Sequence, residues 1–294
     1  MTGSGFRFWG ETKVLDGKAR ASAPGQFIAG SDGLIQYEMA GPAGSQTVVL
    51  IPGFSIPYYL WDPTFKALAE AGFRVLRYNL YGRGYSDRPD VVYDRSLFER
   101  QLLSLLSALA IRAPVDLLGV SMGGAIAVGF TDRYPERVRR LCLIDPAGLP
   151  MAGSPLKRLV QAPVVGEWLI AVMGDRILVA DIPKDFYRSD RFPEYAAQYP
   201  PQMQYIGFKR AVLSTLRHGP LENMAEAYRR VGQQDRPVWL IWGRHDRTLP
   251  FSTSERVRAL LPQAEFHAIE EAGHVPHYEH PEVVHPLLIN FLRR

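Results

Sequence analysis

A serine flanked by glycines is the feature of this sequence that points most directly to chemistry. Residues 119–124 read Gly-Val-Ser-Met-Gly-Gly and follow the mostly apolar run 115–118. A helix is predicted for residues 122–134, so Ser121 falls in the turn between a strand and a helix. A turn this tight leaves no room for side chains at the flanking glycines, and it exposes the serine hydroxyl at the strand end. The pattern predicts a nucleophilic serine.

A serine hydroxyl needs a general base, and the base needs an acid that orients it. Of the seven histidines, His274 stands in a loop between a predicted strand and the last predicted helix. His277 and His280 are the alternatives, but both lie closer to Pro281, where that helix is expected to start. We therefore predict that His274 is the base.

Two aspartates follow predicted strands and compete for the role of the acid. Asp246 follows the strand 237–242, and Asp145 follows the strand 138–144. We favour Asp246, which lies in the loop between the strand 237–242 and Leu249-Pro250. The order serine, acid, histidine along the chain is also the one expected when such groups occupy successive strand ends. Ligands bind outside the carboxyl ends of such strands.

A tetrahedral oxyanion requires backbone donors. The amide of Met122 follows the serine and lies at a helix N-terminus, where the helix dipole favours negative charge. The second donor is expected from the turn Pro52-Gly53-Phe54 after the strand 47–51, with the amide of Phe54 as the candidate.

Strand and helix signals alternate along most of the chain, which predicts an α/β fold with a doubly wound, mostly parallel sheet. Residues 1–30 are expected to be irregular. The core is predicted to comprise residues 31–147 and 237–294, and residues 148–236, which lack a clear strand, are expected to form an inserted helical cap. The predicted strands are 47–51, 74–79, 115–119, 138–144, 237–242 and 264–268, and the predicted helices are 63–71, 97–110, 122–134, 252–260 and 282–292.

Composition excludes several classes of function. The 294 residues are 47% hydrophobic and 22% charged, as in an ordinary globular protein, and the net charge of +4 comes from scattered basic pairs, which argues against nucleic acid as a partner. The single cysteine, Cys142, excludes disulfides and cysteine-rich metal sites. No secretory signal and no transmembrane segment is recognised, so a cytoplasmic location is expected.

These motifs resemble the α/β-hydrolase superfamily, in its capped branch of carboxylesterases, monoacylglycerol-lipase-like enzymes, carbon–carbon bond hydrolases, epoxide hydrolases and haloalkane dehalogenases. The resemblance covers about residues 30–148 and 236–294 and includes the stretch 74–87, RVLRYNLYGRGYSD. Two departures are informative. Pro52 stands where many members carry histidine. Ser121 stands where dehalogenases and epoxide hydrolases carry aspartate, which argues against those two activities.

The resemblance implies that the inserted segment roofs the site and selects substrates. Its apolar residues between 159 and 173 are expected either to pack the cap on the core or to line an acyl pocket or a lipid-facing entrance. Arg210 is a candidate for binding an acidic substrate group, although a solvated charge is the simpler interpretation. The candidate pocket walls are Phe54, Met122, Phe186, Tyr205 and Val275.

The sequence thus predicts a serine hydrolase of carboxylic esters that uses Ser121, His274 and Asp246 and needs no metal or organic cofactor. The expected substrate is a small or lipid-like ester, with peripheral lipid contact through the cap. Two alternatives remain open. One is a carbon–carbon hydrolase of dienone acids, and the other is a non-catalytic ligand receptor on the same fold.

Overall fold

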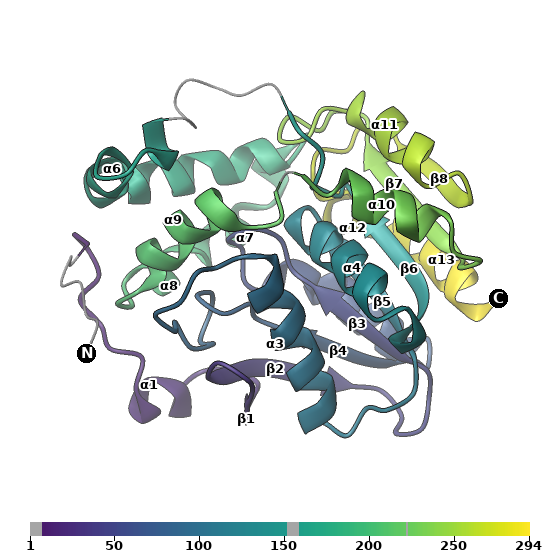
Figure 1. Cartoon of the computed structure of the whole chain (residues 1–294), viewed down its shortest axis with the longest axis horizontal. Helices are drawn as coiled ribbons and strands as arrows, with labels where there is room; N and C mark the ends of the chain where they lie inside the picture. The colour runs from purple at the N-terminus through teal and green to yellow at the C-terminus, as the bar shows by residue number, and fades with distance from the viewer. Residues whose placement is uncertain (1–7, 152–158, 222) are drawn as a thin grey trace.

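The computed structural model describes residues 8–151, 159–221 and 223–294, and an eight-stranded sheet forms its centre (Figure 1). The strands lie in the order β1-β2-β4-β3-β5-β6-β7-β8. β1 is antiparallel to β2 and β2 to β4, while all other neighbours pair in parallel. The strand bounds are β1 Gln26–Ala29, β2 Leu34–Ala40, β3 Thr47–Ile51, β4 Arg74–Tyr78, β5 Val115–Val120, β6 Val138–Ile144, β7 Val238–Gly243 and β8 Ala264–Ile269.

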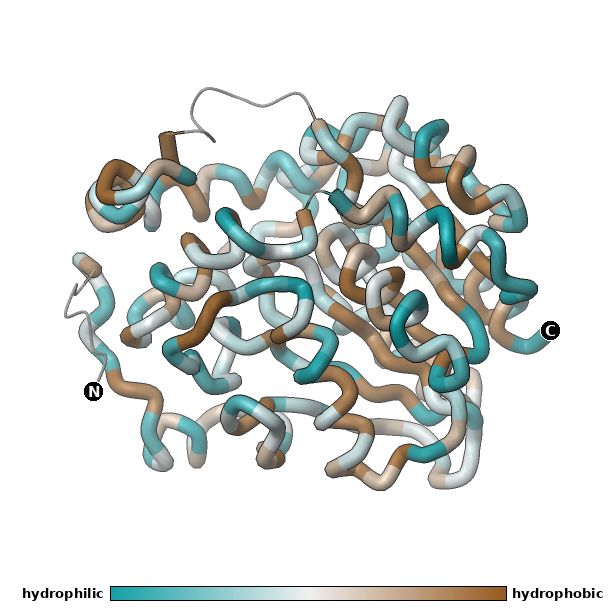
Figure 2. The backbone as a smooth tube through the Cα atoms, viewed as in Figure 1, coloured by the Kyte–Doolittle hydropathy of each residue, from teal (hydrophilic) through white to brown (hydrophobic). Residues whose placement is uncertain are grey.

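The central strands are buried along their whole length. Every residue of β3, β5 and β7 is buried, and Figure 2 shows hydrophobic colour running along the middle of the sheet. This explains their sequences, because a parallel strand covered on both faces reads as a continuous apolar run. The predicted doubly wound α/β sheet is confirmed.

Helices cover both faces of the sheet and enclose two separate apolar clusters. One cluster lies beneath α3, α4, α10 and α11, and the other lies beneath α2, α12 and α13. Their bounds are α2 Asp62–Glu70, α3 Arg95–Ala108, α4 Met122–Arg133, α10 Ala225–Gly232, α11 Thr253–Leu260, α12 Pro276–Glu279 and α13 Pro281–Arg293.

Between β6 and β7 the described chain contains further helices and no strand of the sheet. In this insertion α6 packs against α9, whereas α10 packs against α4 and belongs to the layer on the sheet. Within the described ranges, no helix combines the length and apolar character needed to cross a bilayer. The inserted elements are α6 Val165–Asp181, η3 Ile182–Asp185, η4 Ser189–Arg191, α7 Pro193–Ala197, α8 Pro200–Met203 and α9 Phe208–His218.

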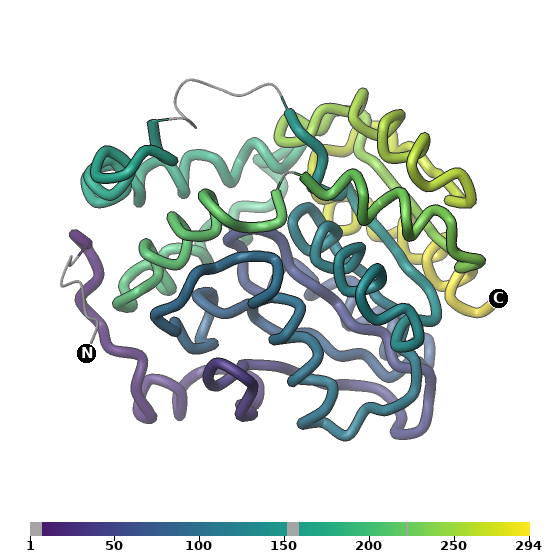
Figure 3. Tube along the Cα trace, viewed as in Figure 1, coloured from purple at the N-terminus to yellow at the C-terminus, as the bar shows by residue number. Residues whose placement is uncertain are grey.

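The N-terminal part differs from the irregular segment expected for residues 1–30. It contains the short helix α1 (Gly17–Ala21) and the edge strand β1, while residues 1–7 lie outside the described residues. Figure 3 shows this segment running beside the inserted helices. The amide of Thr12 donates to the carbonyl of Gln204 at 2.8 Å, and the amide of Ile206 donates to that of Lys13 at 2.9 Å. The N-terminal segment is therefore hydrogen-bonded to the insertion.

Candidate active site

Ser121 lies between β5 and α4 in a strained turn. Its φ of 55° and ψ of −123° place a non-glycine residue in a sparsely populated region. A Cβ at Gly119 would lie 2.3 Å from the carbonyl oxygen of Gly123, and a Cβ at Gly123 would lie 2.2 Å from that of Ile51. Both glycines are therefore required by close backbone approach, and this holds the Ser121 turn against the end of β3.

His274 and Asp246 form a buried hydrogen-bonded pair. Nδ1 of His274 lies 2.7 Å from Oδ2 of Asp246. The other carboxylate oxygen of Asp246 accepts hydrogen bonds from the amides of Thr248 at 2.8 Å and Leu249 at 2.9 Å. The amide of His274 donates to the carbonyl of Asp185 at 2.7 Å, which anchors the histidine loop to η3 of the insertion. These contacts fix the imidazole so that Nδ1 faces the carboxylate.

The other ring nitrogen of His274, Nε2, is buried and has no hydrogen-bond partner among the described residues. Since His274 and Ser121 line the same cavity, Nε2 is available to a group bound there. Burial acts to lower the pKa of His274, but the charge and hydrogen bond of Asp246, with the charge of Asp185, outweigh it and raise the pKa above its ordinary value. The arrangement suits a general base held in one tautomer.

The two alternative histidines lie in other environments. Nε2 of His277 faces the carbonyl of Leu60 at 3.2 Å, and burial lowers the pKa of His277 to about 3. His280 contacts the carboxylate of Glu282 and the carbonyl of Glu271 through its two nitrogens. Neither lines the cavity that Ser121 and His274 share.

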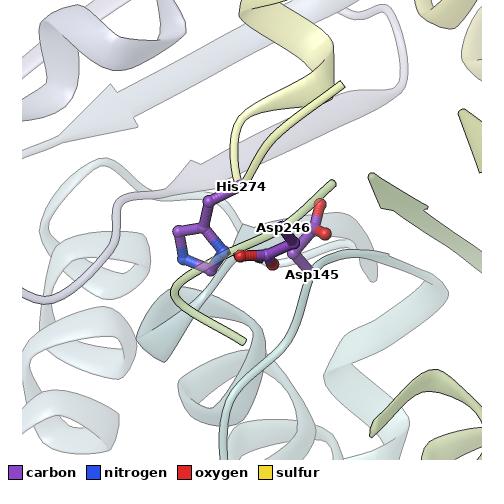
Figure 4. Close-up of side chains that lie close together, drawn as sticks. All are labelled: Asp145, Asp246 and His274. Atoms are coloured by element: carbon purple, nitrogen blue, oxygen red, sulfur yellow. Dashed lines mark hydrogen bonds and ion pairs between the residues drawn. The ribbon is translucent and has the colours of Figure 1, made fainter. Parts of the chain in front are cut away.

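Asp145, the alternative acid, also lies at this site (Figure 4). Its Oδ1 accepts the amide of Gly243 at 2.9 Å. One oxygen of Asp145, one of Asp246 and a ring nitrogen of His274 lie within 4.8 Å of one another, a grouping with the donor types of a metal site. Of the two carboxylates, it is Asp246 that contacts the histidine.

The turn expected to supply the second oxyanion donor lies beside the serine. A Cβ at Gly53 would lie 3.5 Å from Cβ of Ser121, and Phe54 lines the cavity. Arg83 fixes the position of this turn, because its Nε donates to the carbonyl of Phe54 at 2.8 Å. The Arg83 side chain is fully buried and also donates to the hydroxyl of Thr215 at 3.0 Å and the carbonyl of Tyr81 at 3.2 Å.

Arg83 is a residue that the sequence analysis missed. Burial lowers the pKa of Arg83 to about 10, so the guanidinium stays charged at neutral pH. Its place in Gly82-Arg83-Gly84 reads as a surface turn, and only the packed structure shows the guanidinium reaching the Phe54 peptide.

The cavity at Ser121 and His274 has a volume of about 320 Å³. Its lining has an apolar part, which includes Phe54 and Val275, and a polar part formed mainly by η3 and the loop after β7. The apolar residues are Phe54, Ile56, Leu60, Val120, Leu178, Ile182, Tyr195 and Val275, and the polar ones away from Ser121 and His274 are Ser55, Asp181, Lys184, Asp185, Arg247 and Thr248.

Three other candidate residues lie away from this lining. Phe186 is buried among the rings of Phe192 and Tyr195, and Tyr205 packs edge-on against Tyr85. Met122 is the first residue of α4 and its side chain is fully buried in the core, so only its backbone amide remains a candidate for contact with a substrate. The structure does not bring Phe186 or Tyr205 to the cavity, because other aromatic rings enclose Phe186 and because Tyr205 packs against Tyr85 of the core.

Arg210 also lies away from the cavity lining. Its guanidinium forms an ion pair with Asp90 at 2.8 Å and donates to the carbonyls of Arg88 and Pro89. The Arg210 guanidinium is therefore held in an ion pair with Asp90. It does not line the cavity and does not reach a substrate there.

Comparison with known proteins identifies the family. Residues 46–281 match the model of the alpha/beta hydrolase fold, and the chain belongs to this family. Lipase 1 of Psychrobacter immobilis is 28% identical over 262 residues, which cover 86% of this chain and 78% of that protein. The 2-hydroxy-6-oxononadienedioate/2-hydroxy-6-oxononatrienedioate hydrolase of Klebsiella pneumoniae is 30% identical over 261 residues, 85% of this chain and 88% of that protein.

A solved structure supports the same assignment of the fold. The enol-lactonase of Burkholderia xenovorans LB400 aligns with a TM-score of 0.79 and 22% identity over 92% of this chain and 100% of its own. The protein is thus an α/β-hydrolase enzyme. Its lipase relatives fit the carboxylesterase-like branch, and its other relatives extend to dienedioate hydrolases.

Proposed function

We propose that the protein is a serine hydrolase that cleaves carboxylic esters through an acyl-enzyme. One observation carries the proposal. Ser121 and His274 line one cavity, where Nε2 of His274 has no partner among the described residues and Nδ1 is held by Asp246. A nucleophile, a base and an orienting acid in this arrangement form the constellation of acyl transfer.

In the proposed reaction, the hydroxyl oxygen of Ser121 attacks the ester carbonyl while Nε2 of His274 accepts the hydroxyl proton. Asp246 stabilises the imidazolium that forms, and the amides of Phe54 and Met122 bind the oxyanion. His274 then gives its proton to the departing alcohol, leaving an acyl group on Ser121. Water, deprotonated by the same nitrogen, releases the acid and restores the serine.

The size and lining of the cavity guide the choice of substrate. A volume of about 320 Å³ lies at the small end of the range for ligand pockets, roughly 300–1,000 Å³. The apolar side chains suit an acyl chain, and the polar side at η3 suits an alcohol with hydrogen-bonding groups. This favours esters with short or medium acyl chains.

A carbon–carbon hydrolase of dienone acids is the second candidate, favoured by the dienedioate hydrolase relatives and by Arg247. Among the described residues Arg247 has no hydrogen-bond or ion-pair partner, so it is available to a substrate carboxylate. Asp185 and Asp181 act in the opposite sense, because they line the same cavity and repel an anionic substrate. Lys184 is already paired with Asp181 at 2.5 Å. We therefore place ester cleavage first.

The exposed face of α6 supports a further part of the proposal, that the ester arrives from a lipid interface. Trp168 and Val172 are about 60% exposed, and they lie on the helix whose last turns provide Leu178 and Asp181 to the cavity. Aromatic and aliphatic side chains on such a helix favour insertion at the headgroup boundary. Exchanging Trp168 for serine should lower binding to phosphatidylglycerol vesicles in co-sedimentation. Val283→Ser on α13 is the control for an exposed apolar side chain away from the insertion.

Turnover of p-nitrophenyl esters from acetate to palmitate tests the proposed function, with Ser121→Ala as the blank. We expect serine-dependent hydrolysis with an optimum at short or medium chains, and a loss of at least about 10⁴-fold in kcat for Ser121→Ala. Preference for a 2-hydroxy-6-oxodienoate over every ester would establish the second candidate. Ligand binding without turnover, unaffected by Ser121→Ala, would instead identify a receptor.

A further inference from the structure

Asp145 is a buried carboxyl group beside the Asp246–His274 pair that the proposed reaction does not use. It follows β6 directly and its side chain is completely shielded from solvent. Figure 4 shows its carboxyl group next to that of Asp246, with His274 beyond. One of its oxygens, Oδ1, accepts the amide of Gly243, and the other, Oδ2, has no hydrogen-bond partner among the described residues.

The surroundings of the two carboxyl groups differ. Asp246 faces three donors, the amides of Thr248 and Leu249 and the ring of His274, and all three stabilise its anion. Asp145 faces a single donor. Two buried carboxylates side by side do not both ionise, so the proton belongs on the group with fewer donors.

The charges around Asp145 act in the same direction. Burial, together with the negative charges of Asp246 and Glu279, raises the pKa of Asp145 well above its ordinary range. His274 is faced by Asp246, by Asp185 of η3 and by His277 of α12. One oxygen of Asp145 lies within 4.8 Å of one oxygen of Asp246, so a proton on Asp145 has that carboxylate as its neighbouring acceptor.

We propose that Asp145 is a positioning residue that keeps a proton and donates it in a hydrogen bond to Asp246. This bond would hold the Asp246 carboxylate in its orientation toward Nδ1 of His274. It would also reduce the negative charge on the Asp246 oxygens and so limit the rise that Asp246 causes in the pKa of His274. The inference rests on the proposed function, in which His274 is the base.

Two substitutions separate this role from simple packing. Asp145→Asn keeps an oxygen for the Gly243 amide and offers an N–H donor to Asp246. Asp145→Gly removes both groups without backbone strain, because φ at this position is 41° and glycine adopts such values freely. Asparagine also tolerates this region better than most residues.

The readout is the pH dependence of the rate at which a fluorophosphonate labels Ser121, which does not depend on knowing the substrate. The acid limb of this profile reports the pKa of His274. For Asp145→Asn we expect the limb to stay within about 0.2 pH unit of wild type, because a neutral donor replaces a neutral donor. For Asp145→Gly we expect it to move up by about 0.5–1 unit, because Asp246 then holds the proton on His274 more tightly.

Two results would overturn the inference. A shift of the limb to lower pH in Asp145→Asn would mean that a negative charge had been removed, and hence that Asp145 is ionised. An unmoved limb in Asp145→Gly, with only a lower Tm, would leave Asp145 a purely structural role. If the glycine variant does not fold, the asparagine variant alone decides the protonation state. Absence of labelling in the wild-type protein would refute the proposed function itself, which distinguishes the two failures.

Discussion

Replacing Arg83 with methionine should damage catalysis although Arg83 does not touch the substrate. Its guanidinium donates to the carbonyl of Phe54, whose turn carries the proposed oxyanion donor. Methionine fills a similar volume without a donor, so the Phe54 peptide is free to rotate. One oxyanion donor is worth roughly 10²–10³ in kcat, and partial misalignment should cost about 10–10²-fold.

The same substitution should lower stability. It leaves the buried carbonyls of Phe54 and Tyr81 and the hydroxyl of Thr215 without this donor. Each buried acceptor left unpaired costs about 1–3 kcal/mol, and the relief of burying a guanidinium offsets part of this. We expect a net loss of about 3–5 kcal/mol in the free energy of unfolding.

Steady-state kinetics on a p-nitrophenyl ester, with urea unfolding in parallel, measures both effects. Arg83→Met should lower kcat with little change in KM, because the donor acts on the oxyanion of the transition state. Thr215→Val is the matched control, since it removes one partner of Arg83 and leaves the bond to Phe54. A folded Arg83→Met protein with wild-type kcat, or an equal loss in Thr215→Val, would refute this reasoning.

Three further predictions concern pH and the turn at the serine. Asp185→Asn should move the acid limb of kcat/KM down by about half a pH unit, because the charge of Asp185 helps to raise the pKa of His274; an unmoved limb would contradict this. The folded-state pKa of His277 is lowered to about 3, so below pH 6.5 the unfolded chain binds a proton that the folded protein excludes. The free energy of unfolding therefore decreases as the pH is lowered. His277→Gln should remove about 1.6 kcal/mol of the stability lost between pH 6.5 and pH 5, as measured by urea unfolding. An unchanged pH dependence in this variant would mean that His277 is protonated in the folded state. Gly123→Ala should abolish activity or folding, because its Cβ would lie 2.2 Å from the carbonyl oxygen of Ile51. An active and stable variant would show that the backbone of this turn can move to make room for the methyl group.

The sheet could be predicted from the sequence wherever its strands are buried on both faces. β3 and β7 read as apolar runs because no residue on them meets solvent. β5 is equally buried, and its apolar run is interrupted only by Asp116, which is paired with Arg139. The edge strand β1 and its neighbour β2 were not predicted. They are partly exposed, and runs such as Gln26–Ala29 carry neither a continuous apolar pattern nor a clear alternation.

The three catalytic candidates were predictable because each of them follows the end of a strand in the sheet. Ser121, Asp246 and His274 follow β5, β7 and β8, and parallel pairing brings these ends to one edge. The proposed cavity walls Phe186 and Tyr205 were not predictable in the same way. They lie in connecting segments of the insertion, Phe186 after η3 and Tyr205 between α8 and α9, where no helix or strand period in the sequence fixes which side chains face the serine.

Trapping the acyl-enzyme tests directly whether Ser121 is the nucleophile. The protein is mixed with a p-nitrophenyl ester, quenched in acid within the first turnover and digested, and the peptide masses are measured. We expect one acyl group on the peptide that contains Ser121, accompanied by a burst of one equivalent of p-nitrophenol. Turnover of the same ester with no acylated peptide, or with the acyl group on another residue, would contradict this role of Ser121.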